Sequence, residues 1–273
     1  MGKILLLSFC VFPFFCNASE EVNAEYTITS LYSGTIGKSN ITMSLTVSDG
    51  VIFGVYIYKK FKRNIFLNGA FSTDSVVLNE NVGGSTAVMT LKPTMDGYQG
   101  QWCEKKCLPV TLLKHDTFKD GQLDNVKISD SEHGDYELKI TFEGNFENIL
   151  LLDSIDTPTV DFIDINGDGF YDVIVRTDHR PNNGSQSVYI STDQGFVEQK
   201  ELSGVNGTLT YKPLTKNIVF ESKDDCCEKY NKVVYSFNKG KLIKINDMYF
   251  DYTSEKGYSE NGNEVSKAIF ESY

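Results

Sequence analysis

Short segments that alternate apolar and polar side chains run along almost the whole chain, with turn-forming residues between them. The clearest case is ITMSLTV, Ile41 to Val47, followed by SDG and then by VIFGVYIY, Val51 to Tyr58. A period of two on both sides of an Asp-Gly pair predicts a β-hairpin with a tight turn. The chain is therefore expected to be mainly all-β, with an antiparallel β-barrel or sandwich in each of two halves.

The expected strands fall into two groups. In the first half they are NIFLNGAF, SVVLNE, AVMTLKP, GYQGQW and LPVTLL, which extend the hairpin into a β-meander module over residues 24–114. In the second half they are YELKITF, TVDFID, DVIVRT, SVYIS, LTYKP, NIVFES, KVVYSF and KLIKI, within residues 136–250. The polar residues 115–135 are expected to form a linker or long loop.

Two segments of the second half are less regular. FENILLLD, Phe146 to Asp153, fits a strand or part of a helix, because periodicity cannot decide for so short an apolar run. Residues 251–273 form a polar tail in which only EVSKAIFESY suggests a short helix.

The first 18 residues have the pattern of a secretory signal peptide. Lys3 gives a positive start, Ile4 to Phe15 is an almost unbroken apolar run, and CNA precedes Ser19. We expect cleavage after Ala18, and the run is too short for a membrane span of about 20 residues. Cys16 leaves a lipoprotein as the alternative, although bulky Phe15 stands where a small residue is usual. The protein is thus expected to be periplasmic or secreted, without a transmembrane span.

Four cysteines remain once the leader is removed: Cys103, Cys107, Cys226 and Cys227. An even number in an exported protein suggests disulfides, and four cysteines allow three pairings. The five-residue CEKKC can close locally, whereas a bridge between two adjacent cysteines would be strained. Two structural bridges are favoured over a redox switch, and the spacing does not match structural zinc sites.

The chain is acidic, with a formal net charge of −11, and loss of Lys3 with the leader makes it one unit more negative. Such a charge repels nucleic acid and anionic membrane surfaces, so neither is an expected partner. It attracts divalent cations and basic proteins.

One loop of the second half, DINGDGFYD, carries oxygen ligands at alternate positions. The candidate ligands are Asp164, Asn166, Asp168, the carbonyl of Phe170, and Asp172. Calcium takes six to eight such oxygens, so a loop that binds it must point alternate residues inward while it turns sharply. Gly169 suits the turn because it has no Cβ. The spacing predicts a Ca²⁺ site, and an acidic turn without a metal is the alternative.

The loop departs from an EF-hand at its end and on its flanks. Position 12 is Val175 instead of a bidentate Glu, and strand-like segments flank the loop. Asp172 is expected to replace that Glu, and Asp161 or Asp156 could add an oxygen. No acid or base that would suit a catalytic metal lies nearby, so the calcium is expected to be structural.

Sequence motifs of enzymes are missing. His115, His133 and His179 lie far apart, and the chain has no G-x-S-x-G elbow, no HExxH pair and no phosphate-binding glycine loop. We therefore expect no enzyme and assign no catalytic residue. A hydrolase remains a weaker alternative.

Three family resemblances follow from these motifs. VDFIDINGDGFYDVIVRT, followed by Gly195–Phe196, resembles a blade of the FG-GAP, integrin-type propellers. A propeller needs about four to eight blades, and this loop occurs once, so a full propeller is not expected. The first half, with GVYIYKK and VVLNE, resembles a β-rich module of uncharacterised exported bacterial proteins.

The third resemblance covers residues 157–246, from the candidate calcium loop through DHRPNNGSQSVY and GF to YSFNKGKLIKI. This order resembles the periplasmic lysozyme-inhibitor-like proteins, including immunity-type proteins. It implies a β-sandwich that blocks the cleft of a peptidoglycan hydrolase with a protruding loop. Inhibitors of this type often use Ser-Gly-x-x-Tyr, whereas this chain has Ser185 and Tyr189 without a glycine after that serine.

The candidate partner loop is polar and partly aromatic, and arginine and tyrosine are frequent interface anchors. Its members are His179, Arg180, Asn182, Asn183, Ser185 and Tyr189. Two functions are carried forward. One is an exported inhibitor or immunity protein that binds a peptidoglycan hydrolase. The other is a calcium-stabilised structural or adhesive surface module, for which the same loop would be an ordinary solvated surface.

Overall fold

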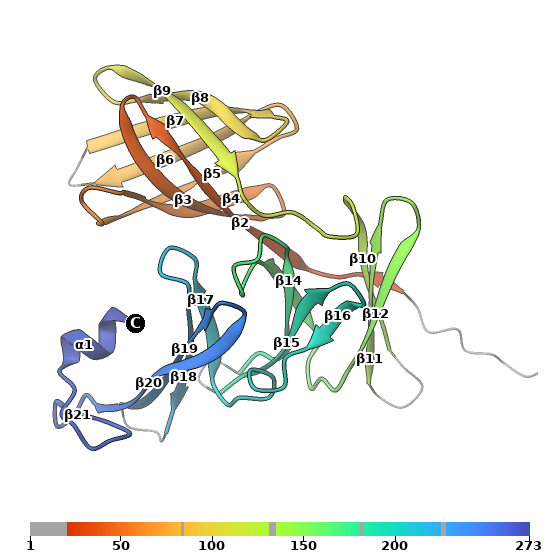
Figure 1. Ribbon diagram of the computed structural model, residues 1–273, viewed down its shortest axis with the longest axis vertical. Helices are drawn as coiled ribbons and strands as arrows, with labels where there is room; N and C mark the ends of the chain where they lie inside the picture. Colours follow the sequence, from red (N-terminus) through yellow and green to blue (C-terminus); the bar gives the residue numbers. More distant parts are fainter. Residues whose placement is uncertain (1–20, 83–84, 131–134, 181–182, 225–227) are drawn as a thin grey trace, which may run out of the picture.

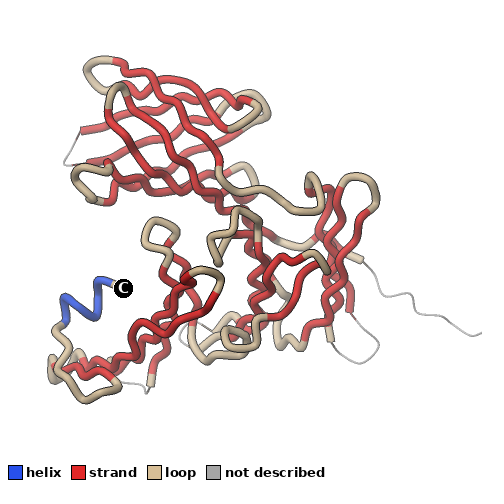
Figure 2. The backbone as a smooth tube through the Cα atoms, in the orientation of Figure 1, coloured by secondary structure: helices blue, strands red, loops and turns tan. Residues whose placement is uncertain are grey.

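The computed structural model describes residues 21–82, 85–130, 135–180, 183–224 and 228–273, and the described chain is all-β (Figure 2). It contains strands β1 to β21 and one short helix, α1 (Lys267–Ser272). The expected leader, His133, Asn182 and the Cys226–Cys227 pair lie outside the described residues. No described helix has the length and apolar character needed to cross a membrane.

Eight consecutive strands of the first half form a closed antiparallel barrel (Figure 1). They are β2 (Tyr26–Ile36), β3 (Ser39–Ser48), β4 (Val51–Tyr58), β5 (Asn64–Phe71), β6 (Val76–Val82), β7 (Ser85–Thr94), β8 (Gly97–Cys103) and β9 (Cys107–Lys114). Each strand pairs with the next, and pairing of β9 with β2 closes the ring. The expected meander is therefore a barrel.

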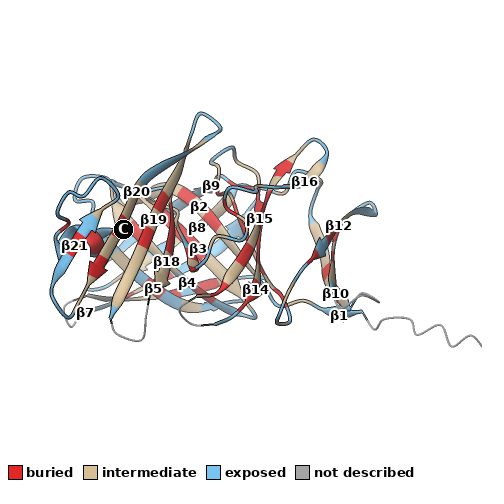
Figure 3. Cartoon of the chain, turned by 90° about the horizontal axis from the view of Figure 1, so that it is seen from below, coloured by how far each residue is buried: buried red, intermediate tan, exposed pale blue. Residues whose placement is uncertain are grey.

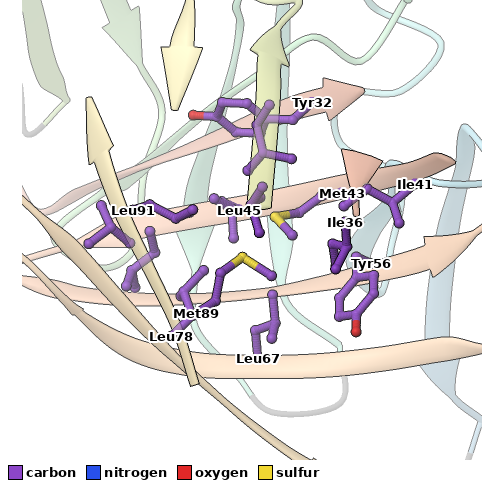
Figure 4. Close-up of a cluster of buried hydrophobic side chains, with 14 residues drawn as sticks. Tyr32, Ile36, Ile41, Met43, Leu45, Tyr56, Leu67, Leu78, Met89 and Leu91 are labelled. Atoms are coloured by element: carbon purple, nitrogen blue, oxygen red, sulfur yellow. The ribbon is translucent and has the colours of Figure 1, made fainter. Parts of the chain in front are cut away.

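Side chains fill the interior of the barrel, as alternation along each strand requires. Along β3, Ile41, Met43 and Leu45 point inward and are at most 1% exposed (Figure 4). Tyr56 of the neighbouring strand β4 and Met89 of β7 belong to the same core. The apolar pattern of the sequence thus produces a packed core inside the ring.

Local turn chemistry follows the sequence closely. Asp49 and Gly50, between β3 and β4, have φ values of 40° and 80°, so both occupy the left-handed region of a two-residue hairpin turn. At the β8–β9 turn, Cys103 and Cys107 form a disulfide, which confirms the local bridge expected for CEKKC.

Strand β2 extends beyond the barrel and joins the second half of the chain. Its first residues, Tyr26 to Thr29, pair in parallel with β13 (Thr159–Ile163). On the other side of β13 follow β14 (Asp172–Asp178), β15 (Ser185–Thr192) and β16 (Gly195–Glu198). Barrel and second half therefore share one continuous hydrogen-bonded sheet.

A separate sheet covers one face of β13–β15. It consists of β1 (Val22–Asn23), β10 (Leu123–Asp130), β11 (Tyr136–Phe142) and β12 (Phe146–Leu152). Phe142 and Ile140 of this sheet share a core with Phe162 and Val173. The segment expected as a linker thus contains strand β10, and the segment that the sequence left open, FENILLLD, is a strand.

A third sheet covers the opposite face of β13–β15. It consists of β17 (Thr208–Lys212), β18 (Asn217–Lys223), β19 (Lys229–Asn238), β20 (Lys241–Asp251) and β21 (Lys256–Ser259). Its Phe220 and Ile218 pack with Ile174. Because β14 is buried on both faces, Asp172 to Val175 are all buried (Figure 3).

The segment expected to be a polar tail is partly ordered against the third sheet. It contains β21 and α1, which lies on the far side of that sheet from β14 (Figure 1). Phe270 of α1 is 1% exposed and packs against Phe250. The short helix suggested by EVSKAIFESY is confirmed.

The closing seam of the barrel provides a test of the fold. A Cβ on Gly34 of β2 would lie 1.9 Å from the carbonyl oxygen of Thr111 on β9, so the two strands would have to separate. We predict that Gly34→Ala lowers the free energy of unfolding by about 2 kcal/mol or more. Urea unfolding measures this.

The control is Thr111→Ala, because Thr111 is exposed on the same seam. It should change the free energy of unfolding by less than about 1 kcal/mol. Equal stability of Gly34→Ala and the unmodified chain would contradict the closed seam.

Candidate cation site between β13 and β14

The DINGDGFYD loop joins two antiparallel neighbours of the central sheet. β13 ends at Ile163, β14 begins at Asp172, and these two residues face each other in the ladder. The expected strand–loop–strand arrangement is therefore present. The loop lies at the edge where the barrel, the central sheet and the third sheet meet.

The acidic side chains of the loop fold it by accepting hydrogen bonds from its own backbone. Asp164 Oδ1 accepts from the N–H groups of Gly167 (2.6 Å) and Asp168 (3.1 Å), and Asp164 Oδ2 accepts from Gly169 (2.9 Å). Asn166 Oδ1 accepts from the Asp168 N–H at 2.8 Å. These bonds hold the chain in a tight turn over Asp164 to Gly169.

Two glycines make this turn possible. Gly167 and Gly169 have φ values of 79° and 90°, in a region that side chains with a Cβ rarely adopt. The role expected for Gly169 is therefore met, and Gly167 has the same role.

Asp172 is completely buried at the base of the loop. Its Oδ2 accepts from the N–H groups of Ile165 (2.9 Å) and Asn166 (3.4 Å), and its Oδ1 accepts from the Ser191 N–H of β15 at 2.8 Å. Burial raises the pKa of this carboxyl to about 8 in the metal-free chain, and Asp168 and Asp164 contribute to the rise. Asp172 thus ties the loop to β15.

The loop keeps oxygen lone pairs for a cation after these bonds are counted. An ionised carboxylate offers about four acceptor positions and a side-chain amide oxygen two. Asp164 and Asp172 each use three, Asp168 uses Oδ1 for the Phe170 N–H and Oδ2 for Asn166 Nδ2, and Asn166 Oδ1 uses one. The carbonyl of Phe170 can supply a further oxygen.

This donor set fits a hard cation with mixed oxygen ligands. Within the described parts of the chain, no three side chains of His, Cys, Asp or Glu are grouped as a ready-made metal cage. A cation here would therefore use the Asn166 amide and the Phe170 carbonyl as well as the carboxylates. Asp172 has one acceptor position left, so it is a weak replacement for the bidentate Glu.

Asp161 and Asp156, which the sequence suggested as additional oxygen ligands, accept other hydrogen bonds in the structure. Asp161 accepts from the Thr27 hydroxyl at 2.7 Å and from Arg176 Nε at 3.1 Å, so it links β2, β13 and β14. Asp156 accepts from the His179 N–H at 2.9 Å.

Sequence reasoning missed a different carboxylate, Asp116, which follows β9. Its side chain is 4% exposed, its Oδ2 accepts from the Leu31 N–H, and its Oδ1 is buried without a hydrogen-bond partner. Burial raises its pKa to about 6, with a further contribution from Asp164. The polar surroundings HDTFKD gave no sign that this residue would be buried beside the loop.

The candidate partner loop is only partly at the surface. His179 and Arg180 are exposed, and Arg180 forms an ion pair with Asp178. Asn183 accepts from the Lys223 N–H at 3.1 Å, and the hydroxyls of Ser185 and Thr177 are 3.0 Å apart. Tyr189 does not lie at the tip: it is 8% exposed and packs in the core with the first covering sheet, because β15 is buried on that side.

A groove of about 320 Å³ runs beside this segment. His179, Arg180, Ser185 and Arg176 line it together with Thr208 of the neighbouring sheet. A cavity of this size is at the lower end of the range found for ligand sites. The exposed residues of the candidate partner loop therefore border this groove.

Comparison with known proteins gives little beyond this geometry. Neither a protein-family profile nor a curated protein sequence matches the chain. One solved structure, described as that of a Xanthomonas type IV secretion system related protein, aligns with 16% identity and a TM-score of 0.36. The alignment covers 73% of this chain and 97% of that protein, and a TM-score this low carries no argument about function.

The buried carboxyls make the metal-free chain sensitive to pH. The folded pKa of Asp116, about 6, lies above its ordinary value of 3.8, so the folded chain binds the proton more tightly than the unfolded chain. The stability from this group is fully present below about pH 4 and is lost as the pH rises through 6.

We predict that Asp116→Asn removes this dependence. With chelator present, the unmodified chain should lose about 1.4 kcal/mol more than Asp116→Asn between pH 5 and 7.5. Chemical unfolding at both pH values measures the difference, and parallel pH profiles of the two proteins would contradict it.

Proposed function

We propose that the chain is an exported, calcium-stabilised module that binds a protein partner and carries out no chemistry of its own. The observation that carries the proposal is the DINGDGFYD loop, which folds around its own acidic side chains and keeps acceptor positions on Asp164, Asn166 and Asp168. These are the ligand types and the spacing that calcium uses.

The role of the ion would be structural. When bound, calcium supplies charge that offsets the repulsion between closely spaced carboxylates. Asp164 follows β13 and Asp172 begins β14, so an ion between them would hold the two strands together. The sequence carries none of the common catalytic motifs, which favours a structural ion over a reactive one.

Export is supported by the chemistry of the chain. The leader-like residues 1–18 suggest secretion, and the Cys103–Cys107 disulfide suits an oxidising compartment. Free calcium outside the cell is in the millimolar range that weak loop sites require.

A partner could be bound at the groove beside His179 and Arg180. Resemblance to the lysozyme-inhibitor-like and immunity-type proteins suggests that the partner is a secreted or periplasmic peptidoglycan hydrolase. Because Tyr189 is buried, the contact would rest on His179, Arg180 and Ser185, which line the groove, and on the nearby Asn183. The second candidate, a calcium-stabilised structural or adhesive module, is favoured by the ion pairing of Arg180 with its own neighbour Asp178.

Calcium is predicted to raise the melting temperature of the mature chain. At a calcium concentration of 100 times Kd the stabilisation is about 2.7 kcal/mol. Asp164→Ala and Asp168→Ala should abolish the rise in a scanning-fluorimetry or calorimetric titration, because each removes a ligand.

Asp251→Asn is the matched control. Asp251 also closes an acidic turn by accepting from the N–H groups of Thr253 and Ser254, but it lies far from the loop in the third sheet. It should leave the calcium response intact. A melting temperature that calcium does not change would refute the site.

The partner surface is tested by capture of peptidoglycan hydrolases. The mature chain, with calcium present, should slow or retain at least one enzyme from a panel of lysozymes and secreted muramidases. Arg180→Ala should weaken this by about tenfold, since exposed Arg side chains at interfaces often cost more than 1 kcal/mol on truncation.

Lys92→Ala, at an exposed position of β7, removes the same charge away from the groove and serves as the control. If no enzyme of the panel is slowed or retained, the inhibitor function is rejected and the structural module is favoured.

A further inference from the structure

The segment that follows the barrel lies directly against the calcium loop. The Thr117 N–H donates to the Gly169 carbonyl at 3.0 Å, and the Tyr171 N–H donates to the Thr117 carbonyl at 2.9 Å. Thr117 and Phe170 form a parallel bridge. Asp116 is therefore held next to the loop by backbone bonds on its C-terminal side.

The other side of Asp116 is fixed to the barrel. Its Oδ2 accepts from the N–H of Leu31 in β2, and the neighbouring His115 N–H donates to the Leu31 carbonyl at 2.9 Å. The carboxylate thus lies between the barrel and the loop in one defined position.

The second oxygen of this carboxylate is an anomaly. Oδ1 is the one buried side-chain oxygen or nitrogen without a hydrogen-bond partner in the part of the chain that the structure describes. An unsatisfied buried polar group costs about 1–3 kcal/mol, and more when it is charged. Such an oxygen is available to accept from a water or to bind a cation.

The space beside it has the size of one such ligand. Asp116 and Asp164 line the same cavity of about 20 Å³, together with Gly167 and Lys216. A cavity needs roughly 10–15 Å³ of this kind of volume to hold one water. The cavity therefore connects the unpaired carboxylate to the first ligand of the loop.

Compared with an EF-hand, the loop itself lacks one carboxylate ligand. Position 12, where an EF-hand has a bidentate Glu, is Val175, which is completely buried in the apolar core. Asp172 cannot fully replace it, because backbone N–H groups use three of its acceptor positions.

We propose that Asp116 supplies this missing carboxylate from outside the loop. Its Oδ1 binds the cation of the loop, either directly or through one water in the shared cavity. The inference rests on the proposed calcium binding, and it adds a consequence: the ion is connected through Asp116 to Leu31, and so to barrel strand β2.

Lys216 is the competing charge. It lines the cavity, its Nζ lies 3.0 Å from the position that a Cβ on Gly167 would occupy, and its charge favours the ionised form of Asp116. In the absence of calcium, Lys216 offsets part of the charge of the two carboxylates. Its removal should therefore make the site more attractive to a divalent cation.

Calcium titration calorimetry of the full mature chain tests the proposal. Asp116→Asn keeps the size of the side chain and an oxygen for the Leu31 N–H, and it should weaken the Kd for calcium at least tenfold. Lys216→Met should tighten it several-fold. Asp120 lies four residues further along the same segment and accepts a hydrogen bond from Asn148 instead. As the matched control, Asp120→Asn should therefore leave the Kd for calcium within twofold.

The outcomes separate the two proposals. If the unmodified chain binds no calcium, the proposed function fails. If it binds calcium and Asp116→Asn binds equally well, the calcium loop stands and the role of Asp116 is refuted; a weaker Kd for Lys216→Met would refute it too. Terbium luminescence lifetimes give a second readout, the number of waters bound to the ion. One additional water in Asp116→Asn indicates that Asp116 binds the ion directly. An unchanged number of waters together with a weakened Kd indicates that Asp116 binds the ion through a water.

Discussion

The parallel pairing of β2 with β13 is the constraint on which the arrangement of the chain depends. It joins residues that are 134 positions apart, and a half-buried set of side chains reinforces it: the Thr27 hydroxyl donates to Asp161, which also accepts from Arg176. Because β2 is at the same time part of the closed barrel, β13, the strand that precedes the DINGDGFYD loop, has a fixed position relative to the barrel. No other strand belongs to both halves in the described chain.

Three carboxyl groups lie around the DINGDGFYD loop, close to strand β2. Asp116, Asp164 and Asp172 come from different elements, and burial raises the pKa of each. Polar backbone groups compensate part of the cost: they donate to all three carboxylates. A divalent cation would compensate more, since it favours the ionised forms that burial disfavours. Structural stability and the proposed calcium binding thus depend on the same group of oxygens.

The sequence predicted those parts of the fold that depend on neighbouring residues. The Asp49–Gly50 turn, the bridge of Cys103 with Cys107 and the strand–loop–strand around Asp164 follow from local spacing, because turn type, short-range bonds and side-chain alternation are local properties. The all-β class followed from the same patterns. The layers were not predictable in this way: β14 has only three consecutive apolar residues, Val173 to Val175, and nothing local identifies the two sheets that cover its faces.

The errors have physical reasons. β10 was expected within a linker because its exposed residues are polar, and its buried Val126 and Ile128 are too few to outweigh them. Tyr189 was assigned to a loop tip, yet its strand begins at Ser185 and buries it. Asp116 was not identified at all, because its role depends on the loop, the barrel and the third sheet meeting, and no local pattern encodes that contact.

Hydrogen–deuterium exchange with and without calcium tests the central claim that one ion stabilises the loop and the barrel strand attached to it. Slower exchange with calcium is expected in the loop over Asp164 to Asp172 and also in β2 around Leu31, whose N–H donates to Asp116. Slower exchange confined to the loop, with β2 unchanged, would contradict the claim that the ion acts across the junction, and no change in either segment would contradict the calcium site itself.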